Sequence, residues 1–106
     1  MFRAADDGRE FESFYIRPAN GMDCCDPIRK KHGCQYFSFP GYTFSYLRDF
    51  GITDYESSVN TISLNKWSRI KAIVRDSSAV FYVDNVKVLA VSNLKHGAFA
   101  RGNVGL

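Results

Sequence analysis

Glu10 and Glu12 have a spacing that suits glycoside hydrolysis, because residues i and i+2 of a strand point to the same face. Glycosidases need two carboxyl groups that flank the scissile bond, roughly 5 to 5.5 Å apart in retaining enzymes and farther apart in inverting ones. Strand alternation, however, places both carboxylates on the apolar face that contains Phe14 and Ile16. We therefore expect Glu12 to accept hydrogen bonds from loop amides, and we predict no catalytic residue.

The histidines and cysteines form no recognised nucleophilic or metal-binding motif. His32 and His96 fall in predicted loops, and a dyad of His32 with Cys34 has no supporting motif around it. Cys24, Cys34 and His32 would make a poor zinc site, since zinc sites use cysteines that are two or more residues apart with further ligands. The cysteine count is odd, and adjacent Cys24 and Cys25 would close a strained ring. We expect free thiols, no metal site and no cofactor.

The residue pattern best suited to a function is that of a sugar-binding surface. Such a surface needs flat aromatic rings for the apolar face of a pyranose and planar polar groups for its hydroxyls. Tyr15 and Arg17 point away from the apolar face of their strand, and the following loop and hairpin supply further polar and aromatic side chains. The predicted ligand-binding residues are Tyr15, Arg17, Asn20, Gln35, Tyr36 and Tyr46.

Several of these side chains could instead serve only the fold, and the same holds for some residues outside the predicted site. Tyr15 and Tyr36 also suit half-buried sheet positions, and Arg17 also suits an ion pair with a loop carboxylate. Asn20 and Asp23 could orient a hydroxyl, but one amide and one carboxylate are too few for calcium. Trp67 opens a strand, where we expect it to pin the sheet edge to the adjacent loop. The basic run at 29–32 is typical of a solvated loop.

Antiparallel strands must position these residues, because short alternating apolar runs recur between turn signals and no amphipathic helix persists. The predicted strands are 2–5, 10–17, 34–39, 42–47, 67–75, 79–83, 86–91 and a last one that begins within 102–106. Pro40 and Gly41 form the turn of a hairpin, and the strands from 67 to 91 form a meander with short turns. The longest predicted loops are 18–33, 48–60 and 93–101.

The composition fits a single soluble domain over residues 1–106. Apolar residues make up 45% of the chain and aromatic residues 15%, which is enough to fill one core and excludes disorder. A net charge of +3 does not suggest a nucleic-acid partner. No window approaches the roughly 20 apolar residues of a membrane span, and the chain as given shows no signal peptide. The sequence leaves the cellular compartment open.

Six segments resemble, in order and spacing, the concanavalin A-like lectin/glucanase superfamily, in particular its laminin-G-like jelly-roll domains. They are FRA at 2–4, FESFYIRP at 11–18, LNKW at 64–67, VFYVDN at 80–85, LKHG at 94–97 and GNVGL at 102–106. The resemblance implies an all-β, antiparallel jelly-roll-type sandwich, with ligands on the concave face or the rim loops. The tight acidic cluster of the family's glucanases is not present here.

Members of this superfamily normally have additional strands before Phe2 and a closing strand after Leu106, so the resemblance implies a sandwich that is incomplete at both ends. Open sheet edges must be covered, charged or paired. The predicted function is a non-catalytic recognition module that binds a carbohydrate or glycan on its polar face. The alternative is a structural module that completes its sheets as a homo-oligomer, and a glycoside hydrolase is the least favoured reading.

Overall fold

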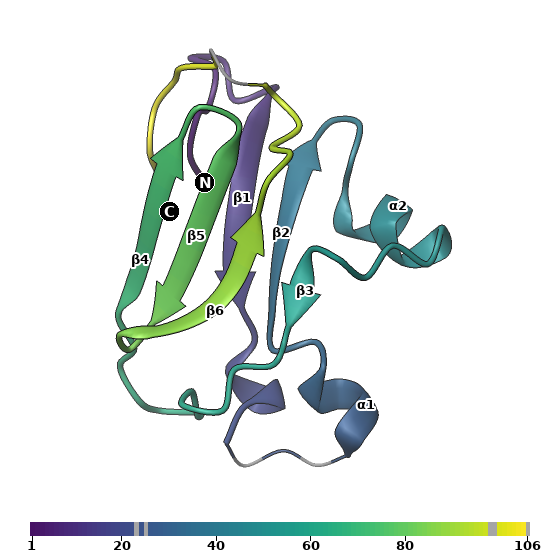
Figure 1. Ribbon diagram of the computed structural model, residues 1–106, viewed down its shortest axis with the longest axis vertical. Helices are drawn as coiled ribbons and strands as arrows, with labels where there is room; N and C mark the ends of the chain where they lie inside the picture. Colours follow the sequence, from purple (N-terminus) through teal and green to yellow (C-terminus); the bar gives the residue numbers. More distant parts are fainter. Residues whose placement is uncertain (23, 25, 98–99, 106) are drawn as a thin grey trace.

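The computed structural model describes residues 1–22, 24, 26–97 and 100–105, and within them the chain forms two antiparallel, three-stranded sheets (Figure 1). The first sheet, in the order β1–β2–β3, contains β1 (Phe11–Ile16), β2 (Cys34–Phe39) and β3 (Glu56–Ser57). The second, in the order β4–β5–β6, contains β4 (Ile70–Arg75), β5 (Ser78–Val83) and β6 (Val86–Val91). The helical segments are short: η1 (Pro18–Asn20), α1 (Pro27–Lys30) and α2 (Phe44–Asp49).

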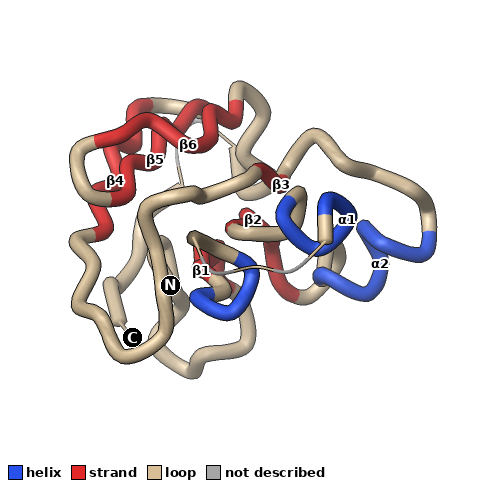
Figure 2. The backbone as a smooth tube through the Cα atoms, turned by 90° about the horizontal axis from the view of Figure 1, so that it is seen from below, coloured by secondary structure: helices blue, strands red, loops and turns tan. Residues whose placement is uncertain are grey.

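The core lies between the two sheets, which Figure 2 shows as separate layers. Phe81 of β5 is its centre: the ring is fully buried and stacks on Phe14 of β1, with ring centroids 4.3 Å apart and an interplanar angle of 4°. Tyr36 of β2 and Phe2 also contact the Phe81 ring, at centroid distances of 6.5 and 6.1 Å. One aromatic ring therefore joins the two layers, and Phe14 and Ile16 of β1 pack against the same core.

Most of the predicted strands are confirmed, but the strand predicted at 42–47 is wrong. Only Tyr42 forms a β-bridge, with Ser38, and the chain then enters helix α2. Thr43 caps this helix, because its hydroxyl accepts a hydrogen bond from the Tyr46 N–H at 3.3 Å. Leu47 is the one buried residue of α2. A single buried position in six residues leaves no helical period, so the sequence pattern of this apolar run does not reveal the helix.

The ends of the described chain are strand-like only at isolated positions. Phe2 bridges to Glu12, and Ala4 bridges to Asn103, so the segments predicted as the first and last strands lie beside each other. The amino group of Met1 donates to the Gly105 carbonyl at 2.8 Å. Leu106, the final residue of the predicted last strand, lies outside the described residues.

Strand β4 is an edge strand whose inner face is only partly covered. Its register places Ala72 opposite Phe81 and Ile70 opposite Val83, so both side chains share the inner face of the sheet. Nevertheless Ile70 is 47% exposed and Ala72 is also exposed, whereas Phe81 and Val83 are buried. The alternation of β4 was predicted correctly, but the first sheet does not extend far enough to bury its first half.

The cysteines depart in part from the predicted free thiols. Cys34 is a free, fully buried thiol, which confirms the prediction for that residue. Cys24 is in a disulfide, so the prediction of a free thiol there is wrong; the number and spacing of cysteines do not report which sulfur atoms the fold brings together. Cys25 lies outside the described residues. Across the described part of the chain, no helix is long and apolar enough to cross a membrane.

Candidate functional site

The outer face of the first sheet holds a connected group of polar side chains from β1, β2 and the residue after β1. Tyr15 pairs with Gln35 across the sheet, and its hydroxyl donates to Gln35 Oε1 at 2.6 Å. The Arg17 guanidinium donates to the Tyr15 hydroxyl and, at 3.3 Å, to Gln35 Oε1. Its carbon lies 4.9 Å from the centre of the Tyr15 ring, within cation–π range. The strand register thus brings together three of the predicted site residues.

Arg17 and Gln35 of this group border a pocket of about 220 Å³ beside the sheet, whereas Tyr15 does not line it. The pocket is lined by Arg17, Asn20, His32, Gln35, Phe44, Arg48 and Glu56. Asn20 and Arg17 reach the same backbone oxygen, because Asn20 Nδ2 donates to the His32 carbonyl at 3.2 Å and Arg17 Nη1 donates to it at 3.1 Å. The segment after β1 and the segment before β2 are thereby tied together at the pocket. Asp23, the predicted partner of Asn20 in orienting a hydroxyl, lies outside the described residues.

Glu56 is a pocket residue that sequence reasoning missed. It lies in β3, whose two residues pair with β2 so that Glu56 stands opposite Gln35. Its carboxylate Oε2 lies 2.6 Å from His32 Nδ1, and the Glu56 side chain is 13% exposed. Apolar residues in 48–60 do not recur with the period of a strand or of a helix, and a strand of two residues is too short to produce such a pattern. The pairing with Gln35 was therefore not detectable from the sequence.

Helix α2 supplies the remaining wall of the pocket through Phe44 and Arg48. The Arg48 guanidinium carbon lies 5.9 Å from the centre of the Phe44 ring, and the ring is 46% exposed. Tyr46, a predicted site residue on the same helix, does not line the pocket. Its ring packs instead on Tyr42 and Phe50, at centroid distances of 5.7 and 4.6 Å. Helical spacing explains this, since positions two apart on a helix point to different sides.

The placement of Tyr36 on the polar face is wrong. Gln35 and Tyr36 are neighbours on β2, so they point to opposite faces, and Tyr36 pairs with Phe14 on the core side. Its side chain is fully buried, and its hydroxyl donates to Glu12 Oε1 at 2.6 Å. Burial and the bond to Glu12 together raise the pKa of Tyr36 far above that of a solvated tyrosine. Tyr36 is a core residue with a polar end.

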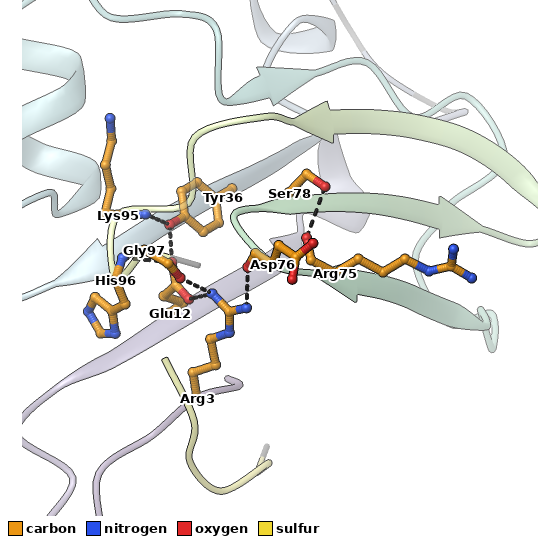
Figure 3. A network of polar contacts seen from close by, with 9 residues as sticks. All are labelled: Arg3, Glu12, Tyr36, Arg75, Asp76, Ser78, Lys95, His96 and Gly97. Atoms are coloured by element: carbon orange, nitrogen blue, oxygen red, sulfur yellow. Dashed lines mark hydrogen bonds and ion pairs between the residues drawn. The ribbon is translucent and has the colours of Figure 1, made fainter. Parts of the chain in front are cut away.

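Glu12 is also in the core, at the centre of the network drawn in Figure 3. Besides Tyr36, Oε1 accepts from the His96 N–H at 3.3 Å, and Oε2 lies 3.4 Å from Arg3 Nη1. Arg3 also donates to the carbonyls of Gly97, at 2.9 Å, and Asp76. The expectation that Glu12 accepts from loop amides is confirmed. The network joins the N-terminal segment, β1, β2 and two loops.

The acid–base state of the polar face depends on burial. Burial raises the pKa of Tyr15, and the neighbouring Arg17 guanidinium opposes that rise. The Tyr15 hydroxyl is therefore protonated at neutral pH, which fits its role as a donor to Gln35.

Burial likewise raises the pKa of the Cys34 thiol to about 11. Within the described residues, no group of three or more His, Cys, Asp or Glu side chains is arranged to hold a metal ion.

An aromatic stripe continues from the pocket along the outer face of the first sheet. It is formed, in order of contact, by Tyr15, Phe37, Phe11 and Phe39. Tyr15 and Phe37 meet edge to face at 5.8 Å, Phe37 and Phe11 at 5.9 Å, and Phe11 stacks on Phe39 at 5.4 Å. The stripe was not predicted as a unit, although each member occupies an alternate position of β1 or β2.

Trp67 does not pin the sheet edge as expected, because its side chain is 98% exposed. The residue lies in the loop before β4, and its indole stays in solvent.

Comparison of the chain with protein-family models, curated proteins and solved structures found no match.

Proposed function

We propose that this protein is a non-catalytic recognition module that binds a carbohydrate in the pocket beside β2. One observation carries the proposal: Arg17, Asn20 and Gln35 converge on a single pocket whose other wall is the exposed Phe44 ring. Such a ring can stack on the apolar face of a pyranose, while the guanidinium groups of Arg17 and Arg48 donate to its oxygens.

The dimensions and surroundings of the pocket favour one ring of a longer glycan. Its volume of about 220 Å³ lies below the roughly 300 Å³ at which pockets for drug-sized ligands begin. The aromatic stripe of Tyr15, Phe37, Phe11 and Phe39 begins where Tyr15 contacts Gln35 at the pocket, and Phe39 at its far end is 39% exposed. Further sugar rings can extend along this stripe. Glu56, with a carboxylate at the pocket, would accept a hydroxyl hydrogen.

The test is a glycan array with the parent chain and matched single substitutions. Phe44→Ser and Arg48→Ala remove exposed pocket side chains with little effect on folding, and we expect each to lower glycan binding at least tenfold. Arg17→Ala should abolish binding. Arg9→Ala is the control, because it removes the same charge from a side chain that is 85% exposed at the other end of β1. A parent chain without glycan signal, or equal signals from Arg17→Ala and Arg9→Ala, refutes the proposal.

We also propose that the two sheets belong to a jelly-roll sandwich of the concanavalin A-like kind. The antiparallel pairing in both sheets, the β4–β5–β6 meander and the bridge between Ala4 and Asn103 support this proposal. An experimental structure tests it, with chain connectivity between the two layers as the criterion. Within the described residues, the strands of each sheet follow one another along the chain, so a Greek-key connection must come from the bridged segments around Ala4 and Asn103. These two segments are expected to extend the first sheet as strands beside β1, whereas segments that lie apart from both sheets would contradict the proposal.

A second candidate function, self-association, is favoured by the uncovered inner face of β4. Ile70 and Ala72 face the core side but remain exposed. If two β4 strands pair antiparallel about Ala72, Ile70 of one copy lies opposite Val74 of the other, which extends the apolar face across both copies. Arg69 and Arg75 would then meet at both ends of the pairing. We therefore expect a dimer that is strengthened by added salt.

Sedimentation velocity over a range of concentrations tests self-association. Ala72→Lys should make the protein monomeric, because two lysines would then meet at the two-fold axis. Ala90→Lys is the matched control, since Ala90 is an exposed alanine of β6 in the same sheet and pairs with Val80 on the outer face. A monomeric parent at all concentrations and salt levels contradicts this function.

A further inference from the structure

Four large apolar side chains are exposed at one end of the molecule, and we call them the apolar tip. They are Met22, Ile28, Leu64 and Trp67, with exposed fractions of 52%, 72%, 63% and 98%. Met22 lies between η1 and α1, Ile28 lies in α1, and the other two lie in the connection from β3 to β4. Figure 1 shows α1 and this connection together at the lower end of the molecule.

The segments that carry the tip are held together by the backbone. The Met22 N–H donates to the Ile62 carbonyl at 2.7 Å. Gly21 passes so close to Ile62 that a Cβ atom on Gly21 would lie 2.1 Å from the Ile62 carbonyl oxygen. Pro18 of η1 lines a shallow depression of about 450 Å³ together with Leu64 and Trp67. The fold therefore holds Met22 beside the segment that carries Leu64 and Trp67.

Basic residues neighbour the apolar tip in the chain. Arg29, Lys30 and Lys31 belong to or follow α1, and Lys66 lies between Leu64 and Trp67. The acidic residues of these segments are Asp26 and, in the sequence, Asp23. The Asp26 carboxylate is engaged as the cap of α1, where it accepts the Arg29 N–H at 2.8 Å. This end of the molecule thus combines exposed apolar side chains with an excess of positive charge.

We propose that this end docks on the surface of an anionic lipid bilayer. The apolar tip would enter the boundary between headgroups and acyl chains, where the amphipathic indole of tryptophan is favoured. The four cations would face the negatively charged headgroups. Three of the four tip residues are aliphatic, which favours a lipid surface over nucleic acid, whose bases stack on flat rings. None of the four lines the proposed sugar pocket, so the two proposals are independent.

Trp67 makes the proposal directly measurable, because it is the one tryptophan of the chain and its indole is 98% exposed. We expect its fluorescence to shift to shorter wavelength, and to become protected from acrylamide, when vesicles with about 30% phosphatidylserine are added. Vesicles of phosphatidylcholine alone should give little shift. Added salt should weaken the binding, because the attraction between the basic residues and the headgroups is screened.

Charge substitutions separate this docking from nonspecific adsorption. The double variant Arg29→Gln, Lys31→Gln should bind anionic vesicles about 25-fold more weakly, since each cation near the surface contributes about fivefold. The control Arg9→Gln, Arg101→Gln removes two exposed cations from elsewhere and should bind like the parent. Leu64→Ser keeps the tryptophan reporter and should also weaken binding severalfold.

Three results would overturn the proposal. They are no spectral shift with anionic vesicles, an equal shift with phosphatidylcholine alone, and equal binding by the two double variants. A shift with a single-stranded oligonucleotide but not with vesicles would overturn it as well, because it would assign this end of the molecule to nucleic acid.

Discussion

Replacement of Glu12 by Gln removes the charge from the buried network that joins five segments of the chain. The side chain is fully buried, and the Arg3 side chain that faces it is 11% exposed. Loss of one partner of a buried ion pair costs about 3 to 5 kcal/mol. The cost here should be near the lower limit, about 3 kcal/mol, because Arg3 keeps its bonds to the Gly97 and Asp76 carbonyls. For a chain of this size, that corresponds to a fall in Tm of roughly 15 °C.

Urea unfolding at pH 7, followed by circular dichroism, measures this change in the free energy of unfolding. Glu10→Gln is the control, since Glu10 is an exposed carboxylate two residues away and should change stability by less than about 0.5 kcal/mol. A double-mutant cycle with Arg3→Met should yield a coupling of about 1 to 3 kcal/mol. A loss below about 1 kcal/mol for Glu12→Gln, or additive single variants, would show that the network does not stabilise the fold as described.

Three further predictions concern the core and α2. Because burial raises the pKa of the Cys34 thiol to about 11, the unfolded chain loses this proton first, and the free energy of unfolding should fall as the pH rises from about 9 to 11. Urea unfolding of Cys34→Ala should show a shallower fall than the parent, and an equal fall would contradict the assignment. Phe81→Ala should lower the free energy of unfolding by about 3 to 5 kcal/mol, since it opens a cavity between the sheets, and a loss below about 2 kcal/mol would contradict its central place. Thr43→Ala removes the cap of α2 and should cost about 1 kcal/mol in the same assay, whereas an unchanged midpoint would mean that the cap does not hold the helix.

Within a strand, the sequence alone was a reliable guide to which side each residue faces. Phe14 on the core side and Tyr15 on the outer side of β1 follow directly from the alternation of the pleated chain. The same rule placed Glu12 against the core, where the structure finds it. For β2 the same rule separates Gln35 from Tyr36, so the prediction that both lie on the polar face is wrong.

The candidate pocket was only half predictable. Arg17, Asn20 and Gln35 were singled out because a strand end, a loop and a neighbouring strand supply polar groups side by side. Glu56 and Arg48 were not, because each reaches the pocket through a contact between distant parts of the chain that leaves no periodic signal. The conformations of β3, which has two residues, and of α2, which has one buried position, depend on what these segments pack against.

The sequence by itself determined the strand segments of the two sheets except β3, the short turns of the β4–β5–β6 meander and the orientation of β1, because these depend on interactions between residues close in the chain. Only the tertiary structure decided that residues 44–49 form a helix, that Tyr36 and Glu12 bond each other in the core, and that Trp67 remains exposed. Those outcomes depend on which surfaces the packed sheets cover. Which surfaces become buried depends on how the two layers pack together, and a local pattern of residues does not encode this.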